Sequence, residues 1–111
     1  MAGFVIPVRR IEGVIDTGVA IRNTDLKSAS LKLTLRNTLG APVASGTTTI
    51  ADFPALGHVA KFIDQLFTTA DTSNFTGTMT VEASSGKVTA TGLELGSRAG
   101  QFTTLPVTPL N

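Results

Sequence analysis

Residues 31–36 read Leu-Lys-Leu-Thr-Leu-Arg, and residues 75–83 read Phe-Thr-Gly-Thr-Met-Thr-Val-Glu-Ala. In both stretches, polar residues alternate with apolar or small ones. This period of two residues is typical of a β-strand with one buried face and one face in water. The alternation therefore predicts strands at Leu31–Arg36 and Phe75–Ala83.

Five further segments have weaker strand character and are flanked by Gly, Pro, Asn or Ser. These segments are 4–8, 17–22, 43–50, 87–95 and 101–107. About seven strands in a chain of this length predict one all-β domain over residues 1–111, built as a two-sheet antiparallel β-sandwich of the immunoglobulin-like kind. Turn residues at Asn37–Gly40 and Ser84–Gly86 predict hairpins. The alternation changes phase at Gly92, which predicts a β-bulge there.

A single segment has a helical period. Val59, Phe62, Ile63, Leu66 and Phe67 recur at spacings of three and four residues, which predicts a short helix near 57–67 that covers one end of the sandwich. The buried phase of the predicted elements gives a core of Leu31, Leu33, Leu35, Phe62, Leu66, Phe75, Met79 and Val81. Phe67 and Phe102 also fall on predicted buried faces.

Composition excludes several classes of protein. Hydrophobic residues make up 41% of the chain and charged residues 15%, so a folded core is expected rather than disorder. The formal net charge of +1 offers no field to hold a nucleic acid. No stretch approaches the roughly 18 apolar residues that cross a bilayer. Without cysteine, the chain forms neither disulfides nor thiolate metal sites.

The sequence offers no catalytic constellation, and we expect neither enzyme activity nor a cofactor. His58 is the single histidine, and a solvent-facing role is the simpler interpretation of it. The carboxylates are scattered, although a calcium ion held between loops by Asp25, Asp52 or Asp71 stays an alternative. Sugar binding commonly uses exposed Trp or Tyr, and the chain has neither.

Several segments, spread over nearly the whole chain, resemble a module that recurs in secreted and cell-surface proteins of bacteria. They are 16–23 (Asp-Thr-Gly-Val-Ala-Ile-Arg-Asn), 31–40, 58–67 (His-Val-Ala-Lys-Phe-Ile-Asp-Gln-Leu-Phe), 75–79 and 102–107 (Phe-Thr-Thr-Leu-Pro-Val). The module has no assigned activity and no catalytic residues. The resemblance implies an extracytoplasmic structural or adhesive part, one among several domains of a surface protein, with any export signal outside these residues. It also implies that Asn23 lies in a turn.

The two ends of the chain share an aliphatic residue followed by Pro-Val. Proline cannot donate to a strand ladder, so both ends are predicted at sheet edges, where a second chain pairs most easily. We therefore expect self-association into a closed homo-oligomer or a filament, without membrane insertion. The residues predicted to mediate it are Phe4, Ile6, Pro7, Val8, Leu105, Pro106 and Val107. A module that binds a glycan or a cell-wall polymer is the alternative function.

Overall fold

The structure, a computed structural model, describes residues 3–83, 87–96 and 102–109. The two strands with the clearest alternation are present as β3 (Ala29–Arg36) and β6 (Asn74–Ala83). The other elements are β1 (Gly3–Ile11), β2 (Ile15–Asn23), β4 (Pro42–Phe53), β5 (His58–Phe62), α1 (Ile63–Leu66), β7 (Val88–Gly96), β8 (Phe102–Leu105) and β9 (Thr108–Pro109). The prediction of an all-β fold is confirmed.

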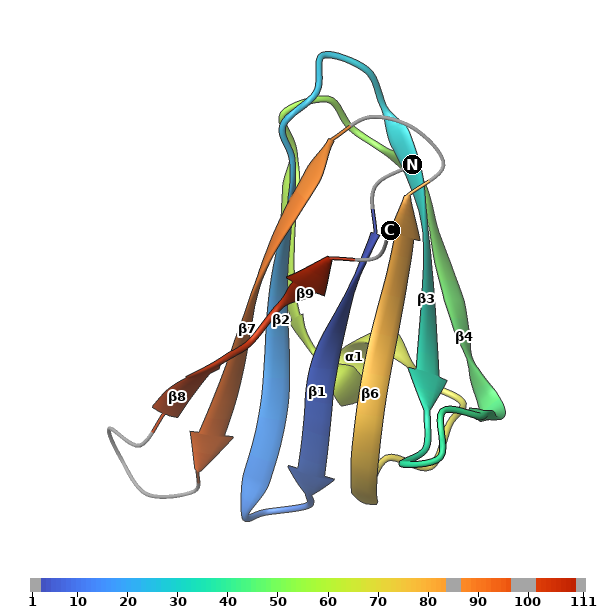
Figure 1. The fold of residues 1–111 in the computed structure, drawn as a ribbon, viewed down its shortest axis with the longest axis vertical. Helices are drawn as coiled ribbons and strands as arrows, with labels where there is room; N and C mark the ends of the chain where they lie inside the picture. The colour runs from blue at the N-terminus through green and yellow to red at the C-terminus, as the bar shows by residue number, and fades with distance from the viewer. Residues whose placement is uncertain (1–2, 84–86, 97–101, 110–111) are drawn as a thin grey trace.

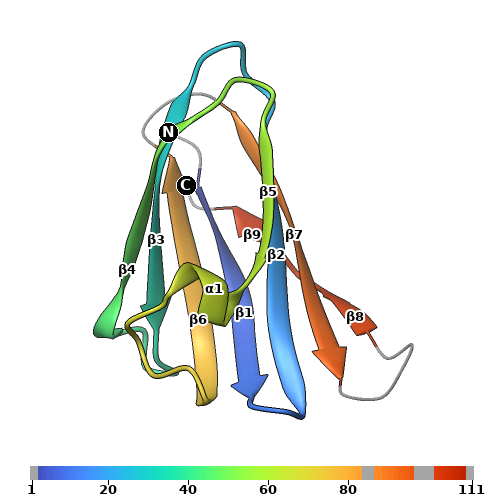
Figure 2. The same cartoon turned by 180° about the vertical axis from the view of Figure 1, so that it is seen from behind.

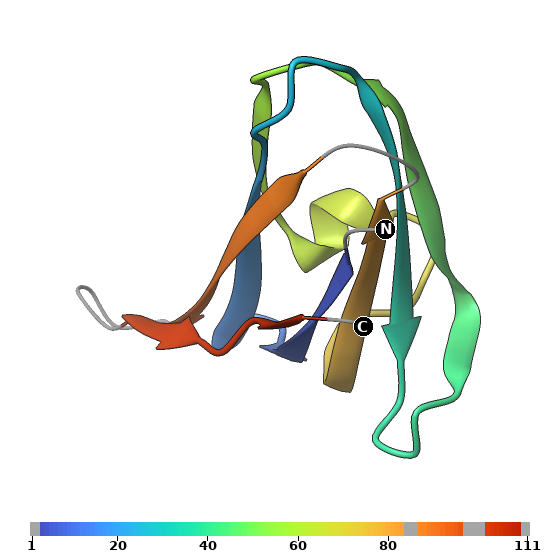
Figure 3. The same cartoon turned by 45° about the horizontal axis from the view of Figure 1, so that its top comes forward.

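Hydrogen bonds join the described strands into one sheet in the order β4-β3-β6-β1-β2-β7-β8 (Figure 1). Two strands lie off this path, because β5 pairs with β2 and β9 pairs with β1. The sheet curls, so β2, β5 and β7 lie across from β3, β4 and β6, with α1 between them (Figures 2 and 3). The predicted separation into two sheets is not confirmed, since β1 and β2 remain paired.

That β1–β2 connection is narrow. The two strands share one pair of residues, Ile11 opposite Ile15, and diverge beyond it. Beyond this pair, the Thr17 side chain on β2 bonds to the backbone of β1 in place of backbone–backbone hydrogen bonds. Its hydroxyl accepts a hydrogen bond from the Arg9 amide at 2.9 Å and donates one to the Arg9 carbonyl at 2.7 Å. A fully buried hydroxyl is thereby satisfied on both sides. The space that β1 leaves beside β2 is taken by β5.

The core lies inside the curl of the sheet. Seven of the eight residues predicted to form the core are buried: Leu31, Leu33, Leu35, Leu66, Phe75, Met79 and Val81. Phe67 is buried as predicted. Phe62 is only partly buried, and Phe102 is 64% exposed, so both of these predictions were wrong. The core also contains Phe4, Ile6 and Val8 from β1.

The helix predicted near 57–67 was mostly wrong. Residues 58–62 form β5, which pairs antiparallel with β2 from Gly18 to Arg22, and only Ile63–Leu66 is helical. A helix this short is marginal by itself, whereas the vacant edge of β2 offers a complete ladder for five residues. The single turn still directs Ile63 and Leu66 into the core, and the Phe62 amide donates to the Gln65 side chain at its start.

Two local predictions about β7 also failed. Pairing between β2 and β7 runs in unbroken register from Ile15–Gly96 to Asn23–Val88, so no bulge occurs at Gly92. Strand β6 pairs with β1 and β3, whereas β7 pairs with β2 and β8. Their connection is therefore not a hairpin, and Ser84–Gly86 itself lies outside the described residues.

The turn at Asn37–Gly40 was predicted correctly. Gly40 has φ of 85°, a conformation that glycine adopts without strain. The Asn37 side chain accepts hydrogen bonds from the amides of Leu39 and Ala41. This turn joins β3 to β4 as a hairpin.

Asn23 is the last residue of β2, where it pairs with Val88, so the expectation that it lies in a turn was wrong. It is fully buried. Its Nδ2 lies within hydrogen-bond distance of the carbonyls of Lys27, Phe53 and Pro54, at 2.8, 3.3 and 3.2 Å. Its Oδ1 accepts from the Asp25 amide at 3.0 Å. One side chain therefore ties the loop after β2 to the end of β4.

Candidate interaction surface

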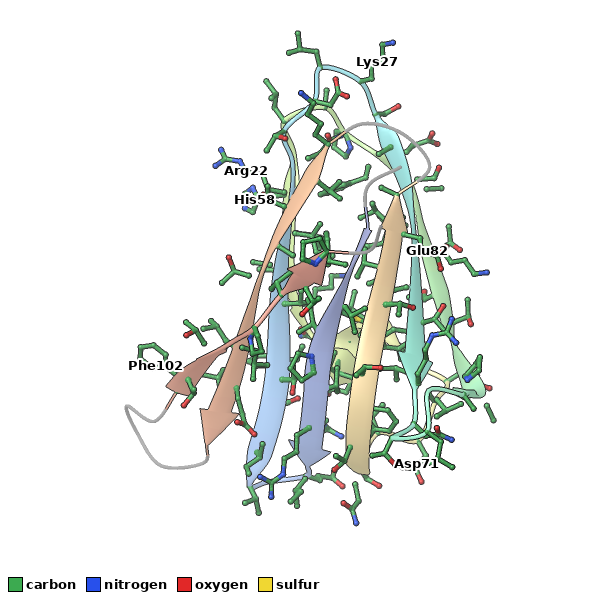
Figure 4. The ribbon with its side chains drawn as sticks, in the orientation of Figure 1. Arg22, Lys27, His58, Asp71, Glu82 and Phe102 are labelled. Carbon is green, nitrogen blue, oxygen red and sulfur yellow. The ribbon has the colours of Figure 1, made fainter. Side chains whose placement is uncertain are left out.

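The residues considered for catalysis or metal binding do not form a site. His58 is exposed at the start of β5, where it pairs with Arg22 on β2. Among the described residues, no three His, Asp or Glu side chains come close enough to hold a metal ion. Asp71 lies at the opposite end of the molecule from Lys27, a neighbour of Asp25 in the loop after β2 (Figure 4), so the three predicted calcium ligands do not meet. In the described part of the chain, no helix is long and apolar enough to cross a membrane.

The predicted self-association residues are mostly occupied within the chain. Strand β1 is not an edge, because β6 pairs along its full length and β9 pairs with Phe4 and Val5 on the other side. Phe4, Ile6 and Val8 are buried in the core, and Pro7 is half-buried. The edge position predicted for 4–8 was wrong, since the two chain ends complete the same sheet.

In the C-terminal segment, Leu105 and Val107 are partly buried, whereas Pro106 is exposed. Leu105 ends β8, and with Val107 it packs against the core, while Pro106 between them is exposed. The edge position predicted here holds only for β8, which ends the sheet order. Leu105 and Val107 are therefore partly buried within the chain and only in part accessible to a second chain.

A different surface has the character of an interface. On β2, the odd-numbered residues from Thr17 to Asn23 are buried, so the even-numbered ones face outward. The strand register places residues of β5 and β7 beside them. We call the resulting surface the β2 outer face. It consists of Asp16, Gly18, Ala20 and Arg22 from β2, His58, Ala60 and Phe62 from β5, and Thr89, Thr91, Leu93 and Leu95 from β7.

The centre of the β2 outer face is apolar. Phe62, Gly18 and Leu93 form one cross-strand row, and Ala60, Ala20 and Thr91 form the next. Both large side chains are half-buried. Phe102 on β8 extends the patch, because it pairs with Leu95 and projects from the left side of the molecule (Figure 4). Phe102 is exposed and the other large apolar side chains are partly exposed, and exposed apolar patches are typical of interaction sites.

The hollow over this centre is shallow. It has a volume of about 190 Å³, and its lining is mostly apolar, with Gly18, Phe62, Leu93 and Leu95 among its residues and Lys61 and Gln65 as the polar ones. Pockets for small molecules are usually larger, about 300–1,000 Å³. Neighbouring hollows continue toward Asp16 in one direction and Arg22 in the other. The hollow toward Arg22 has a volume of about 490 Å³, which falls within that range, so it is the shape of the centre alone that favours a partner lying across the face.

Charge differs between the two ends of the face. At the Asp16 end, the Arg10 Nε lies 3.4 Å from Asp16 and its Nη2 lies 3.6 Å from Asp64. Arg10 also donates to the Thr72 carbonyl at 3.0 Å. Two carboxylates and one guanidinium leave this end negative. Burial raises the pKa of Asp16, an effect opposed by the Thr17 amide and by Arg10.

The opposite end is positive. Arg22 is exposed and lies beside His58 on the outside of the sheet (Figure 4). From Asp16 to Arg22, six residue steps along β2 span about 20 Å at the usual strand rise. The β2 outer face therefore has an acidic end, an apolar centre and a basic end.

The sequence contained a signal for this surface, which we interpreted as a bulge. Leu93 and Leu95 follow Gly92 in the phase opposite to Val88 and Ala90. The uninterrupted register puts Val88 and Ala90 against the core and Leu93 and Leu95 on the outer face. A phase change along a strand in continuous register means that the apolar residues pass from the inner face at Val88 and Ala90 to the outer face at Leu93 and Leu95.

No family model, curated protein or solved structure matches this chain. The resemblance to a bacterial surface module therefore stays a prediction.

Proposed function

We propose that the chain is a non-catalytic structural or adhesive β-domain of an extracytoplasmic protein, and that it works by presenting the β2 outer face to another copy or to a neighbouring domain. We also propose that the curled sheet is equivalent to the two packed layers of an immunoglobulin-like sandwich. In that arrangement β1, β3, β4 and β6 form one layer, and β2, β5, β7 and β8 form the other.

One observation carries the proposal. Phe62, Leu93 and Leu95 lie on the outside of the sheet, where the solvent-facing side of an antiparallel strand is ordinarily polar. When a partner removes apolar surface from water, the free energy of association becomes more favourable by about 25 cal/mol for each Å² buried. A domain of this kind can bind its partner through backbone hydrogen bonds and apolar contacts, and this binding requires no reactive side chain.

A glycan or cell-wall polymer is the competing ligand. The hollow near Arg22 and His58 favours it, because Thr89 and Thr91 add hydroxyl groups there. Against it, the only aromatic side chains available to stack on a sugar are phenylalanines, which lack the polar edge of Trp or Tyr.

An array of glycans and cell-wall polymers, probed with the purified chain and with Leu93→Lys, separates the two functions. We expect no glycan to retain the wild-type chain above the variant. Saturable binding of one glycan class, lost in Leu93→Lys while the variant keeps its circular dichroism spectrum, would replace the structural proposal with the glycan-binding one.

A further inference from the structure

We propose that the partner of the β2 outer face is a second copy of this chain, bound face to face about a two-fold axis that passes over β2 between Gly18 and Ala20. This inference rests on the proposed function, since it names the occupant of the same surface. The argument comes from how size and charge are distributed along the face.

A two-fold axis at this position exchanges the rows of the face. Residue 16 of one copy then lies over residue 22 of the other, and residue 18 lies over residue 20, because a symmetric dimer uses the same patch twice. The strands β5 and β7 lie on opposite sides of β2. A two-fold axis that lies in the interface and crosses β2 at a right angle reverses the strand direction and keeps the cross-strand direction, so it places β5 of one copy over β5 of the other and β7 over β7.

The exchange matches large side chains with small ones. Phe62 and Leu93 both belong to the row of Gly18, and Ala60 and Thr91 both belong to the row of Ala20. In the dimer, Leu93 lies over the partner copy's Thr91, and Phe62 lies over its Ala60. Stacked sheets pack about 10 Å apart by this kind of interdigitation. A face with large residues in both rows would keep the copies apart.

The same exchange matches charge. Arg22 of each copy lies over the acidic end of the other, formed by Asp16 and Asp64 with Arg10. No ion pair involves Arg22 among the described residues, so its charge is free for the partner. The contact occurs twice in a symmetric dimer. A parallel stacking of the two faces would instead oppose like charges, which is unfavourable.

Cross-linking tests the position of the axis, and the absence of cysteine from the chain makes it specific. Ala20→Cys places a thiol beside the axis, and Ala44→Cys is the matched control on exposed β4. With a bismaleimide linker that spans about 10 Å, the usual separation of stacked sheets, we expect Ala20→Cys to form covalent dimers. Ala44→Cys should stay monomeric. Equal cross-linking of both variants would overturn the proposal.

Sedimentation equilibrium tests the apolar centre. The wild-type chain should be a dimer at high micromolar concentration, and Leu93→Lys should weaken it about tenfold or more by burying a charge. Leu39→Lys, in the β3–β4 turn where Leu39 is 92% exposed, should leave the dimer unchanged. A monomeric wild-type chain would overturn the dimer but leave open a neighbouring domain as partner. Dimers that Leu93→Lys does not weaken would overturn this surface and keep self-association.

Charge exchange tests the ends. Arg22→Asp alone opposes two acidic groups, and Asp16→Lys alone opposes two basic groups, so each should weaken its own dimer. Mixed in equal amounts, the two variants should form a heterodimer, because every contact then joins opposite charges. Absence of the heterodimer when both variants retain the wild-type circular dichroism spectrum would overturn the proposed orientation. If Asp16→Lys does not fold, the cross-linking result decides.

Discussion

The outer side of the sheet over β3 and β6 differs in composition from the outer side over β5, β2 and β7. Over β3 and β6 the residues that point away from the core are polar: Lys32 lies beside Glu82, and Thr34 lies beside Thr80, although both threonines are buried. Over β5, β2 and β7 the central rows contain Phe62 and Leu93 instead. Both faces belong to one sheet with one core, so the fold alone does not require the second pattern. Apolar residues in the solvent phase of a strand are therefore better explained by a partner.

The largest expected effect comes from removing the same side chain on the two sides of the sheet. Leu33→Ala empties a fully buried position, and it should lower the free energy of unfolding by about 2–5 kcal/mol. Leu93→Ala changes a half-buried outer position, and in the monomer it should cost about 1 kcal/mol or less. Urea unfolding at low protein concentration measures both. Equal losses would show that the outer face belongs to the core.

A pair of glycines sharpens the same comparison. A Cβ at Gly77 on β6 would collide with the Arg36 carbonyl oxygen on β3, whereas one at Gly18 would meet the Phe62 ring at an ordinary 3.4 Å. Gly77→Ala should therefore cost about 1–3 kcal/mol, as overpacking generally does, and Gly18→Ala should be close to neutral. Thermal unfolding of the two variants checks this order. A more stable Gly77→Ala would contradict the close approach of β3 and β6.

The buried Asn23 holds the end of the sheet together on the β2 side. Asn23→Ala leaves the buried Phe53 carbonyl and the Lys27 carbonyl without this donor, which should cost about 1–3 kcal/mol. Asn74→Ala, at an exposed position of β6, is the matched control and should change stability little. Similar unfolding curves for the two variants would remove the role assigned to Asn23.

The smallest expected effect depends on pH at the acidic end of the β2 outer face. Since burial raises the pKa of Asp16 above 3.8, the folded state binds this proton more tightly than the unfolded chain does. As pH falls through the raised pKa toward 3.8, Asp16 takes up a proton in the folded state first, and the free energy of unfolding increases. As pH rises through the raised pKa, this contribution is lost. The stability of the wild-type chain relative to Asp16→Asn should increase as pH falls through this window.

Asp71 provides a control of opposite sign. Hydrogen bonds from the Ser73 hydroxyl and amide hold the pKa of Asp71 below 3.8, so its contribution is present above 3.8 and lost as pH falls through the lowered pKa. Relative to Asp71→Asn, the wild-type chain should lose stability in acid. The same slope for both aspartates would contradict the burial of Asp16.

The strands that face water on one side were the ones that sequence reasoning predicted best. Leu31, Leu33 and Leu35 alternate with polar residues because β3 has one polar outer face. The same reasoning failed for β7, because Leu93 and Leu95 are apolar on the side away from the core. It failed for β5 as well, since Val59 faces the core and Phe62 faces outward, which imitates a helical spacing.

The position of the chain ends could not be predicted from local pattern. Proline and exposure of ends suggested edge strands at 4–8 and 101–107. In the structure Phe4 pairs with Pro109 and Val5 with Thr108, so the two ends satisfy one another. Pairing between residues this distant in sequence depends on the whole topology, and the period of neither segment contains that information.

The sequence by itself determined the all-β class, the strands 31–36 and 75–83, most of the core, and the turn at Asn37–Gly40. These follow from local periodicity and from the backbone conformation that a single residue permits. Only the tertiary structure decided that β5 occupies the edge of β2, that β1 lies inside the sheet, and that Phe62, Leu93 and Leu95 share an outer face. Which face of a strand meets the core depends on its neighbours, because a strand that is apolar on both sides carries no local preference for either.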